Sequence, residues 1–255
     1  MTWNPEQYLK FAQPRMRPAL DLLTRIDVAE PKAIYDLGCG TGNITRLLAE
    51  RWPDASVTGV DDSATMLAHA AGELPRILWQ QQSLATWRAD RSADLIFSNA
   101  ALHWLPQHAA LFPALLQMLA PGGTLAVQMP RNFLAPSHTL IYETARAGRW
   151  RDTLEPLIAP SPVAEPSFYY SALQPHAKTI DIWETEYLHV LEGRDAVKEW
   201  TKGTWLKRFL DALDEPERSE FEAEYARRVG AAYPPLANGQ TLFPFRRLFI
   251  ICRRH

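Results

Sequence analysis

The stretch Ile34-Tyr35-Asp36-Leu37-Gly38-Cys39-Gly40-Thr41-Gly42-Asn43 is the most informative part of this chain of 255 residues. Its first residues are typical of a buried strand, and a helical pattern begins at Asn43. Glycines in such a turn adopt positive φ and let a ligand approach the backbone closely. Asn43 stands where the dinucleotide fingerprint G-x-G-x-x-G requires its last glycine, so the pattern here is G-x-G-x-G.

Apolar runs alternate with helical patterns over the first 130 residues. The predicted strands are Lys32–Leu37, Ser56–Asp61, Arg76–Gln81, Ala93–Asn99 and Thr124–Met129, and the predicted helices between them include Asn43–Arg51, Ala64–Gly72 and Gln107–Leu119. This alternation predicts an α/β fold with a Rossmann-like, doubly wound sheet that helices cover on both faces. Ligands of such sheets bind at the carboxyl ends of the strands, where the strand order reverses.

The chain is expected to form a single domain over residues 1–255. Its predicted segments are an N-terminal helical segment (1–30), a ligand-binding core (31–130), a proline-rich loop and lid (131–178) and a helical cap insertion between the last two strands (192–238). A plain surface excursion is the alternative for the proline-rich loop. The cap is predicted to contain helices over Asp195–Leu213 and Pro216–Tyr233, and the last strands to cover Thr179–Leu191 and Leu242–Cys252.

Composition and charge exclude several classes of protein. The chain has 27 Lys+Arg against 29 Asp+Glu, a formal net charge of -2, so it has no general attraction for nucleic acid. Because 47% of the residues are hydrophobic, intrinsic disorder is excluded. Two cysteines, Cys39 and Cys252, imply no disulfide framework and favour a cytoplasmic location. No secretory signal or membrane-spanning segment is expected, so we expect neither a nucleic-acid nor a membrane partner.

Acidic residues stand at the ends of the first two predicted strands. Asp36 would repel a pyrophosphate, whereas it would attract a ligand that carries an amino group. Asp61 lies where a carboxylate accepts two hydrogen bonds from a ribose diol in nucleotide-binding α/β folds. A turn or capping role is the alternative for Asp36, and Asp62 or Ser63 is the expected N-cap of the next helix.

The glycine loop, Asp61, Asp94-Leu-Ile-Phe-Ser-Asn99 and Leu119-Ala-Pro-Gly-Gly-Thr-Leu125 together resemble the class I S-adenosylmethionine-dependent methyltransferases over about residues 30–130. The resemblance implies a seven-stranded sheet with an antiparallel last strand. It also implies S-adenosyl-L-methionine as the cofactor, S-adenosyl-L-homocysteine as the product, and no metal. The implied cofactor-binding residues are Asp36, Gly38, Gly40, Gly42, Asp61, Asp62, Met66, Ser83, Leu84, Asn99 and Ala100.

Individual roles follow from the same resemblance. Gly38 and Gly40 would pass under the methionine part of the cofactor, and Asn99 with Ala100 would lie near the sulfonium. Many relatives carry an acidic residue that meets the adenine amino group, but here Ser83 occupies that place. The Ser83 hydroxyl or the backbone amide of Leu84 is then expected to meet adenine. For the nearby Trp87, packing in the core is favoured over covering the adenine ring.

More narrowly, the chain is similar to the trans-aconitate 2-methyltransferase family. The matching features are Trp3-Asn-Pro5, Tyr8-Leu-Lys-Phe11, Trp104-Leu-Pro106, Leu125-Ala-Val-Gln-Met-Pro130 and Arg247-Leu-Phe-Ile250. This similarity implies that a small-molecule carboxylate is the substrate, and that a methyl ester forms on a small tricarboxylic acid, trans-aconitate above all.

A carboxylate acceptor is ionised at pH 7, because carboxyl pKa values lie near 4, so in-line methyl transfer requires no general base. The spare negative charges of a tricarboxylate need local cations, for which arginine is suited. The candidates for the acceptor pocket are Tyr8, Arg15, His103, Trp104, Arg131, Tyr169, Tyr170 and Arg247, with Arg17 and Arg246 as further possibilities. Solvated surface positions are the alternative for the arginines, and simple packing is the alternative for the tyrosines. Trp200 and Trp205 are expected in the core of the cap.

Several alternatives remain open from the sequence. Another acceptor, such as a phenol, a quinone precursor, an amine or a nucleobase, would give His103 the role of proton acceptor. Asn99-Ala-Ala-Leu102 lacks the paired prolines of amino-directed DNA methyltransferases. A non-catalytic S-adenosylmethionine-binding protein would not require the cap, and a nicotinamide oxidoreductase disagrees with the glycine spacing. The arginines at positions 246, 247, 253 and 254 are a weak signal for an RNA-facing edge.

Overall fold

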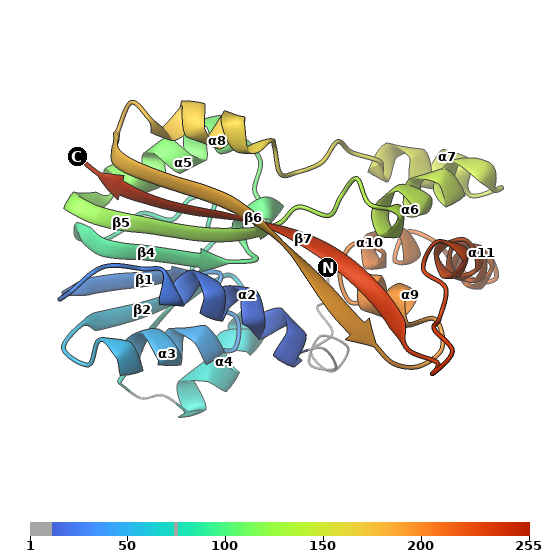
Figure 1. Ribbon diagram of the computed structural model, residues 1–255, viewed down its shortest axis with the longest axis horizontal. Coiled ribbons are helices and arrows are strands. Elements are labelled where there is room, and N and C mark those ends of the chain that lie inside the picture. Colours follow the sequence, from blue (N-terminus) through green and yellow to red (C-terminus); the bar gives the residue numbers. More distant parts are fainter. Residues whose placement is uncertain (1–11, 74–75) are drawn as a thin grey trace. The chain divides into compact units, whose positions relative to one another are not determined.

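The computed structural model describes residues 12–73 and 76–255 (Figure 1). The chain divides into two compact units. One consists of residues 16–130, 162–185 and 247–255, and we call it the sheet unit. The other contains residues 12–15, 131–161 and 186–246, and we call it the helical unit.

Seven strands form one sheet, in the order β3-β2-β1-β4-β5-β7-β6. Their bounds are β1 Ala33–Leu37, β2 Ser56–Asp61, β3 Leu78–Gln81, β4 Ala93–Asn99, β5 Leu119–Pro130, β6 Ala177–Leu191 and β7 Thr241–Arg254. The first five strands pair in parallel, and β7 runs antiparallel to β5. The prediction of a doubly wound, seven-stranded sheet with an antiparallel last strand is therefore confirmed.

Helices pack along the sheet within the sheet unit. They are α2 Ala12–Thr24, α3 Asn43–Arg51, α4 Ala64–Glu73, the short η1 Leu102–Trp104, α5 His108–Gln117 and α8 Pro166–Leu173. Figure 1 shows α3 beside β1 and β2, and α5 with α8 beside β5, in agreement with their contacts. The strand order reverses between β1 and β4, so the carboxyl ends of these two strands are where a ligand is expected.

The core of the sheet unit consists of the strands themselves. All five residues of β1 are buried, and so are Leu95, Ile96 and Phe97 of β4. This agrees with the near-continuous apolar runs in the sequence, because parallel strands are covered on both faces. Trp87 is 1% exposed and packs edge-on against Tyr35, so its predicted role in packing is confirmed.

The helical unit contains α6 Pro136–Ala147, α7 Arg151–Leu154, η2 Glu155–Leu157, α9 Ala196–Lys202, α10 Lys207–Leu210 and α11 Glu217–Ala232. The long helix α11 packs against α6, α9 and α10. Trp200 and Trp205 are 2% and 5% exposed, and Trp205 packs edge-on against Phe133. Their predicted place in the core of the cap is confirmed.

Three predicted elements differ from the structure. Much of the proline-rich stretch 131–178 is helical rather than a loop, because Pro136 and Pro166 stand at the start of α6 and α8, where the fixed φ of proline suits a helix. The predicted helix Asp195–Leu213 is divided into α9 and α10, since α9 ends at Lys202 with Gly203 as its C-cap. Strand β5 begins at Leu119 instead of Thr124.

Candidate functional site

The glycine loop after β1 is anchored to the end of β2 by backbone hydrogen bonds. The N–H groups of Gly38 and Cys39 both donate to the carbonyl oxygen of Val60, at 2.8 and 3.1 Å. The N–H of Gly40 donates to Oδ2 of Asp61 at 2.9 Å. Two segments far apart in sequence thus form one rigid edge at the carboxyl end of the sheet.

The three glycines of this loop all have positive φ, but the space around them differs. A Cβ on Gly38 would lie 2.1 Å from the Cβ of Ala101, so glycine is required there because the loops after β1 and β4 touch. A Cβ on Gly42 would lie 2.5 Å from the ring of Trp79. A Cβ on Gly40 would meet no atom of the described residues within 4 Å. Of the three, Gly40 is the one that faces open space.

Asp61 has both carboxylate oxygens on backbone N–H groups. Oδ2 accepts from Gly40, and Oδ1 accepts from the N–H of Ser63 at 2.9 Å. Ser63 Oγ accepts from the N–H of Met66 at 3.3 Å, so Ser63 is the N-cap of α4, as predicted, and Asp62 is exposed. Since each carboxylate oxygen has two lone pairs, Asp61 retains acceptor capacity for a ligand.

Asp36 is a buried carboxyl group at the end of β1. It is 2% exposed, and Thr45 Oγ1 on α3 donates a hydrogen bond of 2.6 Å to it. Burial raises the pKa of Asp36 to about 7, opposed by the Thr45 hydrogen bond and increased further by the negative charge of Asp61. A cationic ligand group beside Asp36 would favour the ionised form.

The end of β4 carries a strained turn. Ala100 has φ 53, a left-handed conformation that is unusual for alanine. Its N–H donates to the carbonyl oxygen of Gln128 at 2.9 Å, which holds the turn against β5. The side-chain Oδ1 of Asn99 is buried and has no hydrogen-bond partner among the residues that the structure describes. An unpaired acceptor at this edge is available to a ligand.

The predicted adenine-side residues lie in the loop after β3. Ser83 is exposed, and its carbonyl oxygen accepts from the N–H of Thr86 at 3.2 Å. Leu84 is half-buried, and its Cδ1 lies 3.7 Å from the position that a Cβ on Gly38 would take. Leu84 therefore borders the glycine loop.

His103 and Trp104 form part of η1, which follows the strained turn. His103 is 6% exposed, whereas Trp104 is 48% exposed, and their ring centroids are 4.6 Å apart. The two rings thus form one aromatic unit with a buried end and an exposed end.

Tyr169 has its hydroxyl bonded within the protein, which is the packing alternative to its predicted place in an acceptor pocket. It is fully buried, its hydroxyl lies 2.7 Å from Nδ1 of His108, and the N–H of Ala164 donates to it at 3.2 Å. His108 Nε2 lies 3.0 Å from the carbonyl oxygen of Leu102, and burial lowers the pKa of His108. Tyr170 is 55% exposed.

The arginines near β7 have different environments. Arg247 is 5% exposed and lies opposite Pro130 in the register of β5 and β7. Arg246 is exposed, with its Nη2 4.0 Å from Oε2 of Glu186. The backbone N–H of Arg131 donates to the carbonyl oxygen of Arg246 at 2.9 Å. Arg247 is therefore the buried cation of this group.

Two further arginines near the C-terminus bond to backbone carbonyl oxygens. Arg253 Nε donates to the carbonyl oxygen of Gly122 at 2.8 Å, and Arg254 Nη1 donates to that of Gln117 at 2.8 Å. These bonds secure the C-terminal strand, which argues against an RNA-facing edge. Arg17 is exposed on α2.

Two predicted acceptor residues fall at the N-terminus. Tyr8 lies outside the described residues, and so does the side chain of Arg15. The structure therefore provides no position for either side chain.

Gln128 was not among the residues predicted for the site. It is fully buried in β5, and neither Nε2 nor Oε1 has a hydrogen-bond partner in the described ranges. The signal in the sequence was a single amide within the apolar run Leu125–Met129.

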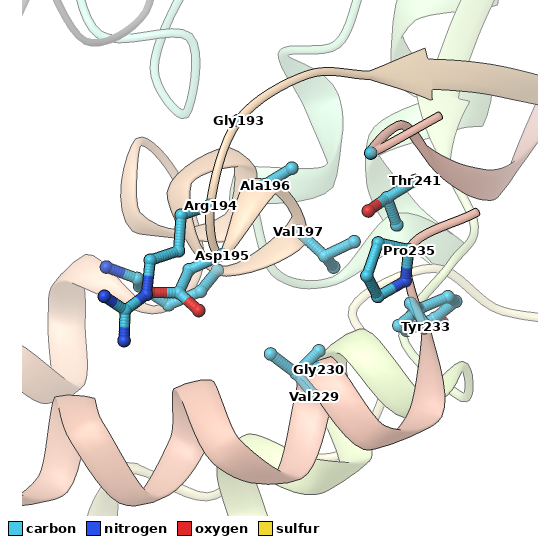
Figure 2. A pocket seen from close by; sticks show the side chains of 12 residues that line it. Gly193, Arg194, Asp195, Ala196, Val197, Val229, Gly230, Tyr233, Pro235 and Thr241 are labelled. Carbon is cyan, nitrogen blue, oxygen red and sulfur yellow. The ribbon is translucent and has the colours of Figure 1, made fainter. Parts of the chain in front are cut away.

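A cavity of 320 Å³ lies within the helical unit. Figure 2 shows its lining, which includes Gly193, Arg194 and Asp195 before α9, Tyr233 after α11, and Thr241 at the start of β7. No predicted cofactor or acceptor residue lines it.

The described residues contain neither a candidate membrane-spanning helix nor a candidate metal-binding group. No helix between residues 12 and 73 or 76 and 255 is long and apolar enough to cross a bilayer. The same residues contain no group of three or more His, Cys, Asp or Glu side chains that could hold a metal ion.

Comparisons with known proteins agree with this geometry. A family described as "Methyltransferase domain" matches residues 34–123. A trans-aconitate 2-methyltransferase of Azoarcus sp. (strain BH72) is 47% identical over 253 residues, which cover 99% of each chain. The YcgJ protein of Bacillus subtilis has a similar fold, with a TM-score of 0.57, 16% identity, and coverage of 93% of this chain and 97% of that one. Phosphoethanolamine N-methyltransferase 2 of Haemonchus contortus, solved with S-adenosylhomocysteine, has a TM-score of 0.53, 16% identity, and coverage of 94% and 53%.

Proposed function

The chain belongs to the trans-aconitate 2-methyltransferase family of S-adenosylmethionine-dependent methyltransferases, and we propose that it forms a methyl ester on a carboxylate of a small tricarboxylic acid, trans-aconitate above all. The observation that carries the proposal is the 47% identity along 99% of both chains to a relative of that name. A shared acceptor class is expected when the similarity extends along the whole chain rather than over the cofactor core alone.

The residues at the carboxyl edge of the sheet fit S-adenosylmethionine. Asp61 has lone pairs left for the two ribose hydroxyls, and Asp36 is a buried carboxyl suited to the ammonium of the methionine part. The open space at Gly40 admits a ligand against the backbone. Asn99 Oδ1, at the same edge, is an acceptor without a hydrogen-bond partner in the described residues. When bound, the cofactor supplies an electrophilic methyl group on a positively charged sulfur.

The chain's own task is then to position the acceptor, because an ionised carboxylate needs no base. Positioning of this kind supplies up to about 7–11 kcal/mol of a reaction barrier. His103, which is largely buried, is placed in this proposal as a hydrogen-bond donor, and the exposed Trp104 as a wall of the acceptor pocket.

The remaining carboxylates of the acceptor require a cation. Arg247 is our first candidate, because a buried guanidinium attracts an anion more strongly than a solvated one and binds a carboxylate with two parallel hydrogen bonds. Arg131 and Tyr170 remain candidates on the sequence alone, as do Tyr8 and Arg15.

Methyl transfer from labelled S-adenosylmethionine to a panel of acids tests the proposal. The panel contains trans-aconitate, cis-aconitate, citrate and isocitrate, and methanol released by mild base reports ester formation. We expect base-labile label with trans-aconitate ahead of the others.

Two results would contradict this expectation in different ways. Label that resists mild base, formed with phenols or amines, would keep the cofactor and replace the acceptor. Binding of S-adenosylhomocysteine without transfer to any acceptor would favour a non-catalytic cofactor-binding protein.

A further inference from the structure

The side chain of Gln128 is fully buried and has no hydrogen-bond partner among the residues that the structure describes. Residues 123–130 of β5 are all buried, and the residues on both sides of Gln128 are apolar. Neither Nε2 nor Oε1 of Gln128 makes a hydrogen bond within the described part of the chain. A buried amide without partners costs free energy that an apolar side chain of similar size would avoid. Its presence therefore points to a ligand.

The register of the sheet places Gln128 between two residues already assigned to the site. Gln128 lies opposite Asn99 of β4 and opposite Phe249 of β7. Residues opposite one another on neighbouring strands point to the same face, and so do residues two apart on one strand. Asn99, Gln128, Phe249 and Arg247 thus share one face, with Arg247 diagonal to Gln128.

Asn99 stands on the cofactor side of this row and Arg247 on the side assigned to the acceptor. The carbonyl oxygen of Gln128 also receives the Ala100 N–H at 2.9 Å, so the backbone of Gln128 is tied to the turn at the cofactor edge. An amide in this position can contact a group that lies between the two binding regions. That group is the carboxylate which receives the methyl.

We propose that the carboxamide of Gln128 binds and orients the reacting carboxylate, whereas Arg247 binds another carboxylate of the same acceptor. This assignment rests on the proposed function. Nε2–H of Gln128 would donate to the carboxylate oxygen that does not react, which leaves the other oxygen directed at the methyl carbon. That oxygen gains the methyl carbon, the carbon–sulfur bond breaks with its electron pair left on sulfur, and no proton moves.

The chemistry explains why an amide, rather than an arginine, occupies this position. Negative charge on the carboxylate and positive charge on sulfur both diminish as the methyl group is transferred. A guanidinium at the reacting carboxylate would stabilise the charged reactant more than the transition state, and binding of that kind slows the chemical step. A neutral amide orients the oxygen with a smaller penalty.

The test compares Gln128→Leu and Gln128→Glu with the wild-type protein. For each we would measure the Tm, the Kd of S-adenosylhomocysteine by calorimetry, and kcat and KM for trans-aconitate. We expect Gln128→Leu to keep or raise the Tm, to leave the Kd within about twofold, and to lower kcat/KM by about 10- to 100-fold, the usual value of a hydrogen bond to a charged group. Gln128→Glu has the same shape but a negative charge, so we expect it to raise KM strongly with the Kd unchanged.

Ser98→Ala is the matched control. Ser98 is also fully buried, one residue before Asn99, but its hydroxyl donates to the carbonyl oxygen of Leu37 at 2.8 Å. We expect this variant to lower the Tm and to leave kcat/KM unchanged, the opposite pattern to Gln128→Leu.

The outcomes separate this inference from the proposed function. If the wild-type protein methylates trans-aconitate and Gln128→Leu does so equally well, the role of Gln128 is wrong and the function stands. If the affinity for S-adenosylhomocysteine fell as much as kcat/KM, Gln128 would be a cofactor-binding residue, and the inference would be overturned. If the wild-type protein methylates no acid in the panel, the proposed function fails, and the assignment of Gln128 fails with it.

Discussion

The Asp61 carboxylate accepts a hydrogen bond of 2.9 Å from the backbone N–H of Gly40, which joins the end of β2 to the glycine loop after β1. One side chain therefore supports the loop and presents its remaining lone pairs to the ligand. The two functions have different effects on the free energy of unfolding. A loss of loop support lowers it, whereas a loss of ligand contact leaves it unchanged in the free protein.

Asp61→Ala is expected to weaken the binding of S-adenosylhomocysteine by about 1.5–3 kcal/mol, roughly 10- to 150-fold, since it removes hydrogen bonds to a charged group. Calorimetric titration measures the change. Asp54→Ala serves as the control, because Asp54 is exposed and lies just before the first residue of β2, at the end opposite Asp61. An unchanged Kd for Asp61→Ala would remove Asp61 from the cofactor site.

The binding of S-adenosylhomocysteine is expected to depend on pH through Asp36, whose pKa burial raises to about 7. The ammonium of the ligand interacts favourably with the ionised carboxylate only, so affinity should rise as pH increases toward 7 and level off above it. Below that pKa the expected slope is about tenfold per pH unit. Titrations from pH 5.5 to 8.5 would show it, and Asp36→Asn should bind more weakly with no such slope.

The same carboxyl makes the stability of the free protein depend on pH with the opposite sign. Between the ordinary value of 3.8 and about 7, the folded state keeps a proton on Asp36 that the unfolded state releases. The free energy of unfolding should therefore decrease as pH rises through this window. Because asparagine resembles the protonated acid, we expect Asp36→Asn to match the wild type near pH 4 and to be more stable at pH 8. Equal stability at both pH values would show that Asp36 is ionised in the free protein.

Gly40→Ala should separate ligand binding from folding. The new Cβ meets no atom within 4 Å in the part of the chain that the structure describes, so the expected cost in stability is that of the left-handed φ of 54, about 1–2 kcal/mol. Affinity for S-adenosylhomocysteine should fall much further if the ligand lies against this glycine. Gly230→Ala, in α11 and also with open space around its Cβ, is expected to raise the Tm and leave the Kd unchanged. Normal affinity in Gly40→Ala would place the ligand elsewhere.

Arg247→Met should raise the KM for the acceptor and leave cofactor affinity unchanged, because it removes a buried cation and keeps most of the apolar stem. Arg246→Met is its matched control at an exposed neighbouring position, and it should change neither quantity. Steady-state kinetics and calorimetry on both variants provide the comparison. A large fall in Tm for Arg247→Met with an unchanged KM would assign Arg247 to the fold.

Tyr169→Phe should reduce the free energy of unfolding by about 1 kcal/mol, because it removes the buried hydrogen bond to His108. Neither the KM for the acceptor nor the Kd of the cofactor should change. Chemical denaturation and kinetics, each compared with the wild-type protein, test both statements. A rise in KM for Tyr169→Phe would return this tyrosine to the acceptor pocket.

The sequence was sufficient for the sheet because its strands are apolar on both faces and its glycines mark the first turn. The helices within the proline-rich stretch 131–178 were predicted as a loop, for a physical reason. Proline interrupts a helix in its interior but suits the first turn, and Pro136 and Pro166 both occupy that position. Only the structure shows which of these positions a given proline takes.

Within the site, motif spacing predicts positions at the carboxyl edge of the sheet more directly than it predicts an acceptor pocket. Motif spacing locates Asp61 and Gly40, since both follow directly from a strand. Whether a side chain such as Tyr169 reaches a pocket or bonds a distant histidine depends on tertiary packing. Gln128 is the converse case, because its significance lies in the absence of partners, which only the folded chain reveals.

The anchored glycine loop has a thermodynamic consequence for ligand capture. Its N–H bonds to Val60 and Asp61, and the bond from Ala100 to Gln128, are all made within the chain itself. Little backbone ordering is left for the binding event, so the heat capacity change on binding should reflect the burial of ligand surface without a contribution from coupled folding. The conformational entropy of this edge is lost when the chain folds. Ligand binding therefore does not have to order the loop, and the affinity is not lowered by that cost.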